Sequence, residues 1–185
     1  MKVCVFFAEG FEEIEAITVV DLLRRAEVEV LTVSITDSLK VVGVHGIPVL
    51  ADIIFEKVDF SQVGMLVLPG GIPGTPNLAK HFGLIDKILK YNKAKKEIAA
   101  ICAAPTILGV MGLLEGKRAV CYPGKEDQLK NAIVTNNMVE SDENITTSRG
   151  VGTAIPFSLR LIERLKDKKT AQAIKEAIVY GEECK

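Results

Sequence analysis

The sequence predicts a doubly wound α/β sandwich built around a mainly parallel β-sheet. Short, continuous apolar runs, typical of strands that are buried on both faces, alternate along the chain with segments of helical periodicity. Such alternation indicates strand–helix–strand units and therefore parallel strand pairing. The 185 residues are enough for a substantial core, so we expect residues 1–185 to form a single domain.

The composition excludes several classes of protein. Apolar residues make up 48% and charged residues 25% of the chain, which is ordinary for a globular protein, and the formal net charge of -1 gives no electrostatic basis for binding nucleic acid or an anionic membrane. No apolar run approaches the ~20 residues that span a bilayer, and the first run is too short for a signal peptide. The four cysteines lack C-x-x-C spacing, which argues against a zinc site or a disulfide scaffold and favours the reducing cytoplasm; they are Cys4, Cys102, Cys121 and Cys184. We expect Cys4 and Cys121 to pack in the core and Cys184 to be a tail thiol.

The first half of the chain predicts most of the sheet. The expected elements are a strand over 3–7, a helix over about 12–26, a strand over 28–35, a hairpin with a glycine-containing turn over 41–52, a strand over 64–68, a helix over about 82–94 and a strand over 97–101. In a doubly wound sheet the binding site lies at the carboxyl ends of the strands. We therefore expect the strand ends at Ala8, Pro69 and Cys102 to meet in one crevice.

The second half of the chain predicts further strands and two more helices. The expected elements are a short helix directly after Cys102, strands over 118–122, 132–139 and 144–148, an amphipathic helix, and a last helix over about 170–179. The amphipathic helix carries Phe157, Leu161, Ile162 and Leu165 on one stripe. A polar, glycine-rich loop over 148–153 precedes this helix.

One face of the first helix carries a carboxyl group where an apolar residue is expected. Val19, Leu22 and Ala26 recur at helical spacing, and one turn back along this stripe stands Glu15. A carboxyl in an apolar site is either protonated or functional, because burying its charge is costly. The alternative is that a slight rotation of the helix lets Glu15 reach solvent.

The opposite face of this helix combines apolar side chains with an acid–base pair. Ile14 and Ile17 lie beside Asp21 and Arg25, which are one turn apart and suited to pairing. Such a mixture is more typical of an interface than of a fully solvated surface. We expect this face to form a homodimer contact.

Two adjacent glycines follow the buried strand over 64–68. Gly70 and Gly71 allow backbone N–H groups to face a cleft without an intervening Cβ. A phosphate site is not favoured, because neither the Walker spacing nor G-x-G-x-x-G is present. Of the two histidines, His45 lies near the hairpin turn and His81 near a helix start, and neither position indicates a catalytic role.

The strand over 97–101 ends on a cysteine and turns at once into a helix. Small residues flank Cys102, and Pro105 suits the first turn of the helix that follows. This pattern is typical of a nucleophile elbow, in which a sharp turn presents the side chain at the carboxyl end of the sheet. Open helix N–H groups and the helix dipole lead us to expect a Cys102 thiol more acidic than a free one. The alternative is that Cys102 is a small core residue.

Four motifs in register give the chain a specific resemblance. They occur in order at residues 11–15 (FEEIE), 68–71 (LPGG), 100–105 (AICAAP) and 147–150 (TSRG). With these motifs the sequence resembles the ThiJ/PfpI superfamily, in the branch of the parkinsonism-associated protein deglycase, from residue 2 to about residue 179. The resemblance implies a flavodoxin-like fold, no cofactor or metal, and a homodimer built partly on the first helix.

The resemblance also implies roles for individual residues. Cys102 would be the reactive thiolate, and Glu15 a protonated carboxylic acid that donates a hydrogen bond to it. The backbone N–H groups of Gly71 and Ala103 would form an oxyanion hole for an adduct on the sulfur. Arg149, with the Asp21–Arg25 pair, would form the wall of the pocket nearest the dimer axis, and Gly70 would contact the substrate.

The sequence departs from the family at one position. Many members carry His-Pro after the strand that follows the elbow helix, whereas this chain has Tyr122 and Pro123. Tyrosine, with a pKa of about 10, is a poor general base near neutrality, but it can orient a substrate or a water molecule. Because no histidine follows Cys102, a cysteine peptidase or a glutamine amidotransferase with a Cys–His pair is disfavoured.

Two functions of different classes remain. The first is a cofactor-free glyoxalase or deglycase, in which Cys102 forms a hemithioacetal with methylglyoxal or a glycated adduct and Glu15 shuttles a proton. The second is a non-enzymatic oxidative-stress sensor or redox-regulated chaperone that acts through oxidation of Cys102. Thiazole monophosphate biosynthesis, an older label in the family, is not supported, because the chain has no kinase-type nucleotide loop.

Overall fold

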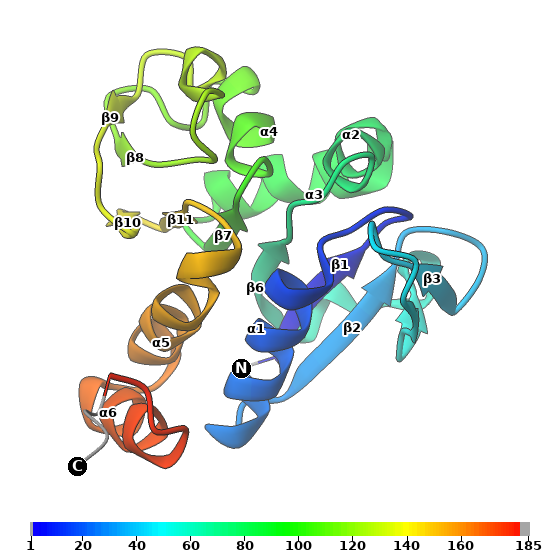
Figure 1. Ribbon diagram of the computed structural model, residues 1–185. Coiled ribbons are helices and arrows are strands. Elements are labelled where there is room, and N and C mark those ends of the chain that lie inside the picture. The colour runs from blue at the N-terminus through cyan, green and yellow to red at the C-terminus, as the bar shows by residue number, and fades with distance from the viewer. Residues whose placement is uncertain (1, 182–185) are drawn as a thin grey trace.

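A seven-stranded sheet forms the centre of the computed structural model, which describes residues 2–181 (Figure 1). The strand order is β10-β11-β7-β6-β1-β2-β5, and all neighbours are parallel except β10 and β11. Its strands are β1 (Lys2–Phe7), β2 (Val30–Ser34), β5 (Ile53–Ile54), β6 (Val63–Leu68), β7 (Glu97–Ile101), β10 (Val139–Asp142) and β11 (Ile145–Ser148). The run β2-β1-β6-β7-β11 has the 2-1-3-4-5 order of flavodoxin-like folds, so the predicted fold class is confirmed.

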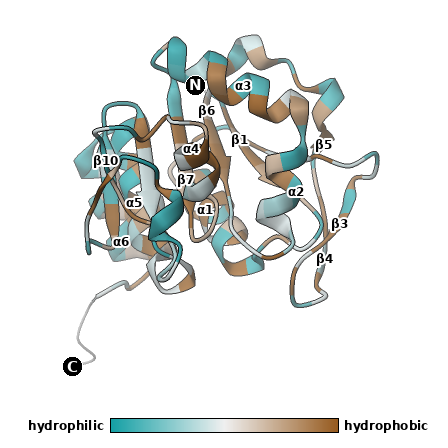
Figure 2. Cartoon of the chain, turned by 90° about the horizontal axis from the view of Figure 1, so that it is seen from above, coloured by the Kyte–Doolittle hydropathy of each residue, from teal (hydrophilic) through white to brown (hydrophobic). Residues whose placement is uncertain are grey.

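Helices cover both faces of this sheet. Because side chains alternate along a strand, β1 sends Val3 and Val5 into one apolar layer and Cys4 and Phe6 into the other. The first layer is completed by α1 (Glu13–Arg25), α5 (Ala154–Leu165) and α6 (Lys168–Ala177), and the second by α2 (Gly74–Lys80), α3 (Phe82–Lys93) and α4 (Pro105–Val110). Figure 2 shows the hydrophobic strands β1, β6 and β7 in the interior, with the helices outside them.

The predicted hairpin over 41–52 is confirmed. It consists of β3 (Lys40–Val42) and β4 (Pro48–Leu50), which pair antiparallel and lie beside the main sheet (Figure 1). Single 3-10 turns complete the description: η1 (Phe55–Lys57), η2 (Phe60–Gln62), η3 (Glu126–Gln128) and η4 (Val151–Thr153). The helix α2 was not predicted.

Two predicted strands were largely wrong. Of 118–122 and 132–139, only β8 (Arg118–Ala119), β9 (Ile133–Val134) and the first residue of β10, Val139, are in strands. β8 and β9 pair with each other outside the main sheet. After β8 the backbone turns toward β11 and the Cys102 turn, because the Val120 N–H binds the Thr147 hydroxyl at 3.0 Å. After β9 the chain bends, since the Thr135 and Asn137 side chains both donate to Glu140.

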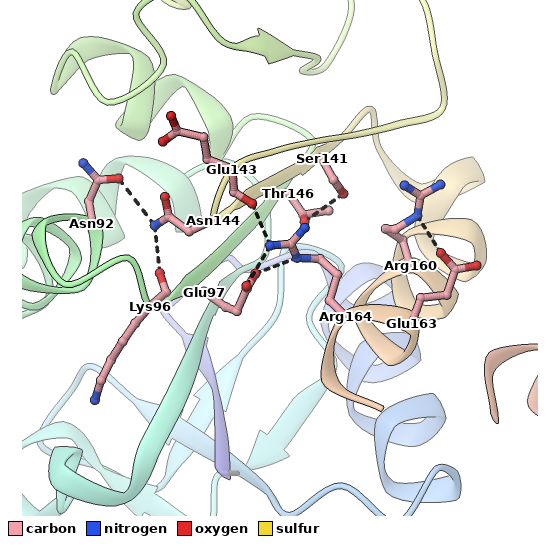
Figure 3. A network of polar contacts seen from close by, with 10 residues as sticks. All are labelled: Asn92, Lys96, Glu97, Ser141, Glu143, Asn144, Thr146, Arg160, Glu163 and Arg164. Carbon is pink, nitrogen blue, oxygen red and sulfur yellow. Dashed lines mark hydrogen bonds and ion pairs between the residues drawn. The ribbon is translucent and has the colours of Figure 1, made fainter. Parts of the chain in front are cut away.

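A polar network fixes the start of β7, at the end of the strand opposite Cys102 (Figure 3). Arg164 on α5 donates two hydrogen bonds to the carboxylate of Glu97, at 2.6 and 2.7 Å, and a third to the carbonyl of Glu143. The Asn144 side chain donates to the carbonyl of Lys96 at 2.8 Å. These contacts join β7, α5 and the β10–β11 turn.

None of the helices in the described part of the chain combines the length and the apolar character needed to cross a lipid bilayer.

Candidate active site

Cys102 lies on a strained turn between β7 and α4. Its φ angle is +64°, in the left-handed region that few residues other than glycine adopt. Two backbone hydrogen bonds hold the turn, because the Cys102 N–H donates to Ser148 at 3.0 Å and its carbonyl accepts from Tyr122 at 2.7 Å. Pro105 opens α4 at its first turn, as expected. The predicted nucleophile elbow is confirmed.

The carboxyl group of Glu15 lies next to this cysteine. The side chain is fully buried, together with Val19 and Leu22 on the same face of α1, so the alternative of a solvated Glu15 is wrong. Its Oε2 atom accepts the Gly70 N–H at 2.9 Å, and the carboxyl group and the Cys102 thiol lie close enough to shift each other's pKa. Its Oε1 atom has no partner among residues 2–181.

The sequence predicts that Gly70 contacts the substrate, whereas the structure places its backbone against Glu15 and Cys102. Its N–H is committed to Glu15, and a Cβ at this residue would lie 2.6 Å from the Cys102 Cβ, 2.7 Å from Oε2 of Glu15 and 2.9 Å from the sulfur. Its backbone therefore packs between the thiol and the carboxyl group. Gly70 positions these two groups and does not offer its N–H to a substrate.

The pair of Glu15 and Cys102 titrates as a unit. Burial raises the pKa of Glu15 to about 7, against the hydrogen bonds from Cys102 and Gly70, which lower it. Burial and the charge on Glu15 raise the pKa of the Cys102 thiol to about 12, although the backbone N–H groups of Ala103 and Gly71 act in the opposite direction. The expectation of an unusually acidic thiol, based on the helix dipole alone, is therefore wrong.

The pair carries one negative charge above about pH 7 and holds one proton between the two groups. The proton can reside on the sulfur or on Glu15. The backbone N–H groups of Gly71 and Ala103 lower the pKa of Cys102 and so favour charge on the sulfur. The nucleophilic form of Cys102 is consequently the tautomer in which Glu15 holds the proton.

A cavity of about 900 Å³ opens over the elbow. It is lined by six of the seven residues that the sequence singled out: Glu15, Gly71, Cys102, Ala103, Tyr122 and Arg149. Tyr122 is half exposed at its edge. Asp21 and Arg25 pair at 2.7 Å on the exposed face of α1 but do not line this cavity, so within one chain they do not form its wall, contrary to expectation.

Among the charged or titratable residues of the cavity wall, sequence reasoning missed Glu12, His45 and Lys125. The hairpin folds back over the start of α1, where the His45 N–H and Nδ1 bind the two carboxylate oxygens of Glu13 at 2.9 and 2.8 Å. This contact raises the pKa of His45. No spacing in the sequence indicates this approach, because residues 13 and 45 lie on different elements.

Glu12, Glu13 and His45 also form the cluster of potential metal ligands in the described residues, with ligand atoms within 4.8 Å of one another. Both oxygens of Glu13 already accept hydrogen bonds from His45. The contact therefore has a structural explanation, namely the attachment of the hairpin to α1.

The other cysteines are placed as expected. Cys4 and Cys121 are buried in the core, whereas Cys102 is partly exposed. Cys184, expected to be a tail thiol, lies outside the described residues.

A cysteine elbow at the carboxyl end of a flavodoxin-like sheet, paired with a buried carboxyl, defines a class of α/β proteins with a reactive thiol. Residues 1–164 match the sequence model of the DJ-1/PfpI family, and the chain belongs to this family.

Similar proteins occur in distant organisms. The protein dj-1beta of Drosophila melanogaster is 33% identical over 179 residues, which cover 96% of each chain, and a deglycase of Pyrococcus abyssi is 34% identical over 90% of this chain and all of its own. The structure of oxidized DJ-1 from Toxoplasma gondii superposes with a TM-score of 0.93 at 36% identity, over 98% of this chain and 99% of that one. The chain spans less than half of the length of two Arabidopsis thaliana DJ-1 homologues, at 41% and 45%.

Proposed function

We propose that this chain is a cofactor-free enzyme of the glyoxalase or deglycase type, acting on methylglyoxal or on adducts of methylglyoxal with amines and thiols. The observation that carries the proposal is the close approach of the buried Glu15 carboxyl group and Cys102 at the base of an open cavity. The name of the Pyrococcus abyssi relative, a deglycase, supports the same reaction class.

The reaction begins with addition of sulfur to the aldehyde. Cys102 transfers its proton to Glu15 as the sulfur bonds to the aldehyde carbon. Glu15 then gives this proton to the aldehyde oxygen, which completes the hemithioacetal and leaves Glu15 as a carboxylate. Backbone N–H groups of Gly71 and Ala103 stabilise the developing oxyanion. These groups lower the pKa of Cys102 and line the same cavity, so they are suited to an oxygen on the carbon attached to the sulfur.

A proton transfer between adjacent carbons follows. Glu15 removes the proton from the hemithioacetal carbon and returns one to the former ketone carbon, while the hydroxyl proton moves from the former aldehyde oxygen to the ketone oxygen. The product is a thioester of a 2-hydroxy acid. Water hydrolyses the thioester, releases lactate and restores the Cys102 thiol. The sum is addition of one water to methylglyoxal, and no external oxidant or reductant is needed.

Tyr122 and Arg149 act on the substrate from the cavity wall. Tyr122 stands where many family members carry histidine, and its hydroxyl orients the substrate or the attacking water. Arg149 offers a cationic group to the carboxylate product. Of the two histidines, only His45 lines the cavity, and its Nδ1 is bound to Glu13, so a Cys–His hydrolase remains the less favoured reading.

The test is methylglyoxal consumption with lactate detection at neutral pH. Wild type is expected to form lactate, and Cys102→Ala and Glu15→Gln are expected to lose at least ~10²-fold in kcat/KM, as expected for loss of a nucleophile or a positioned acid–base group. The matched control is Cys121→Ala, which removes a buried thiol outside the cavity and is expected to retain activity. Equal rates in wild type and Cys102→Ala would refute the proposal for this substrate.

Oxidation of Cys102 supports a second candidate, a redox sensor or redox-regulated chaperone. Cys102 is partly exposed, whereas Cys4 and Cys121 are buried, so peroxide reaches Cys102 first among the described thiols. The Toxoplasma gondii relative was solved as an oxidized protein. Intact-mass measurement after peroxide treatment tests this function: Cys102→Ala abolishes the gain of two oxygens if Cys102 is the sensor.

The same proposal includes a homodimer in the cytoplasm. Ile14 and Ile17 are 55% and 40% exposed on α1, and they border a hollow of about 780 Å³ that Ile47 and Ile178 also line. A second copy of this chain would bury these side chains and bring the Asp21–Arg25 pairs to the interface. Sedimentation of wild type and Ile17→Lys tests it, since a charge at this position should shift the protein to the monomer.

A further inference from the structure

A second hollow lies on the other side of Ala103 from the elbow. It has a volume of about 330 Å³ and lies at the surface between α2, α3, α4 and η3, with exposed Ile72, Ala79 and Val110 among its lining residues. It shares three lining residues with the cavity over Cys102: Ile72, Ala103 and Lys125. The two spaces therefore border each other along the backbone that carries the reactive cysteine.

The lining of this hollow is mainly apolar. Its walls are formed by Ala79, Ile85, Ile107, Val110 and Met111, with Ile72 at the border. By contrast, the cavity over Cys102 presents Glu12, Glu15, His45 and Arg149. A ligand that extends across both spaces would place polar atoms over the elbow and an apolar arm between α2 and α4.

One buried polar atom in the hollow lacks a partner. The Thr75 side chain lines the hollow, the residue is only 5% exposed, and its hydroxyl has no hydrogen-bond partner among residues 2–181. The other buried threonine of the hollow, Thr106, donates to the carbonyl of Ala103 at 2.7 Å. Because buried polar groups are nearly always paired, the Thr75 hydroxyl indicates a place for a ligand or for a water molecule that a ligand displaces.

We propose that this hollow is a substrate subsite that takes the apolar arm of a 2-oxoaldehyde, so that alkyl- and arylglyoxals are better substrates than methylglyoxal. The inference rests on the proposed function, since it assigns the arm of a substrate whose aldehyde reacts at Cys102. The volume lies at the lower end of the ~300–1,000 Å³ of small-molecule sites and accommodates a phenyl ring or a hexyl chain.

The first experiment compares methylglyoxal with propylglyoxal, hexylglyoxal and phenylglyoxal. Burial of each added methylene is expected to raise kcat/KM by up to about fourfold until the hollow is filled. Ala79→Phe fills the hollow from α2 and is expected to reduce kcat/KM for hexylglyoxal at least tenfold while leaving methylglyoxal within about twofold. Ala173→Phe, the same change at an exposed position of α6, is the matched control.

Two kinetic results would overturn the inference. One is a kcat/KM that does not rise from methylglyoxal to hexylglyoxal. The other is an Ala79→Phe variant that loses activity equally toward both substrates, because the side chain would then disturb the elbow and not a subsite.

A binding measurement separates this inference from the proposed function. The unreactive ketone 2-octanone is titrated into wild type and Ala79→Phe, with the methyl NMR signals of Ile72, Val110 and Met111 as reporters. Shifts that saturate in wild type and vanish in Ala79→Phe support the subsite even if no 2-oxoaldehyde is turned over, in which case only the proposed reaction fails. Absence of these shifts in wild type refutes the subsite, whatever the enzyme does with methylglyoxal.

Discussion

The Oε2 atom of Glu15 accepts the backbone N–H of Gly70 at 2.9 Å, across a separation of 55 residues. This hydrogen bond joins the first turn of α1 to the loop after β6 and holds the carboxyl group near Cys102. The Gly70 backbone lies so close to both Glu15 and Cys102 that any side chain there would displace one of them. The geometry of the catalytic pair thus depends on a residue that takes no part in chemistry.

Gly70→Ala is expected to lose activity and stability together. The added methyl would contact the Cys102 Cβ, the sulfur and Oε2 of Glu15 at 2.6–2.9 Å, so the pair must move apart. Overpacking of this kind costs about 1–3 kcal/mol, and a displaced nucleophile costs ~10²-fold in rate. Chemical denaturation and methylglyoxal kinetics measure the two effects.

The control for this substitution is Gly152→Ala. Gly152 lines the same cavity, yet an added Cβ there meets no atom within 4 Å. Its activity and stability are expected to stay close to those of wild type. If Gly70→Ala kept the activity and stability of Gly152→Ala, the close approach of Gly70 to Glu15 and Cys102 would not matter for either property.

The elements around the site could be predicted because their signals are local. The apolar runs of β6 and β7 need only their own residues to indicate buried strands, and the burial of Glu15 follows from its spacing to Val19 and Leu22. The turn at Cys102 is marked by the small residues around it.

The predictions that failed depend on contacts between residues that are far apart in the sequence. The chain leaves the strand conformation after Ala119 because Val120 and Tyr122 donate to groups on β11 and at the elbow. The pKa of Cys102 is raised by burial and by a carboxylate 87 residues earlier in the chain, which outweigh the local N–H groups. Likewise, His45 reaches the cavity because the hairpin folds onto α1.

The rate is expected to rise with pH through about 7. Below this pH both protons of the Glu15–Cys102 pair are present and the sulfur is neutral, whereas above it one proton has left and the charge can reside on sulfur. A profile of kcat/KM from pH 5 to 9.5 measures the midpoint. In Glu15→Gln the residual rate should rise only at the higher pKa of the buried thiol, so an unchanged midpoint would show that Glu15 is not the titrating group.

The stability of the fold is expected to fall between about pH 4.5 and pH 7. Burial raises the folded-state pKa of Glu15 to about 7 from its ordinary value of 4.5, so the unfolded chain loses this proton first as the pH rises. The cumulative loss is about 3 kcal/mol at most, from ~1.4 kcal/mol for each pKa unit. Denaturation of wild type and Glu15→Gln across this range isolates the effect, because the variant keeps every other titrating group. Parallel curves would contradict a raised pKa at Glu15.

Arg164→Lys is expected to lower stability without changing the chemistry. Arg164 binds both oxygens of Glu97 at the start of β7, and the two side chains are only 24% and 21% exposed (Figure 3). Lysine keeps the charge but loses the paired geometry, at a cost of about 1–2 kcal/mol. Arg160→Lys on the same helix, whose contact with Glu163 is more exposed, should change stability by less than ~0.5 kcal/mol. Equal losses of stability in the two variants would mean that the hydrogen bonds of Arg164 at the start of β7 contribute no more than an exposed ion pair.

The Cys102→Gly variant is expected to be more stable than Cys102→Ala, although glycine usually lowers the stability of a fold relative to alanine. Cys102 has a φ of +64°, which costs a residue with a Cβ about 1–2 kcal/mol, whereas glycine loses only about 0.5–1 kcal/mol more chain entropy than alanine. Cys102→Gly should therefore exceed Cys102→Ala by roughly 0.5–1 kcal/mol in the free energy of unfolding. At Cys121, which has no positive φ, the same pair of variants should show the opposite order. Urea denaturation of the four variants measures both differences. If the alanine variant is the more stable one at both positions, the backbone at Cys102 is not strained.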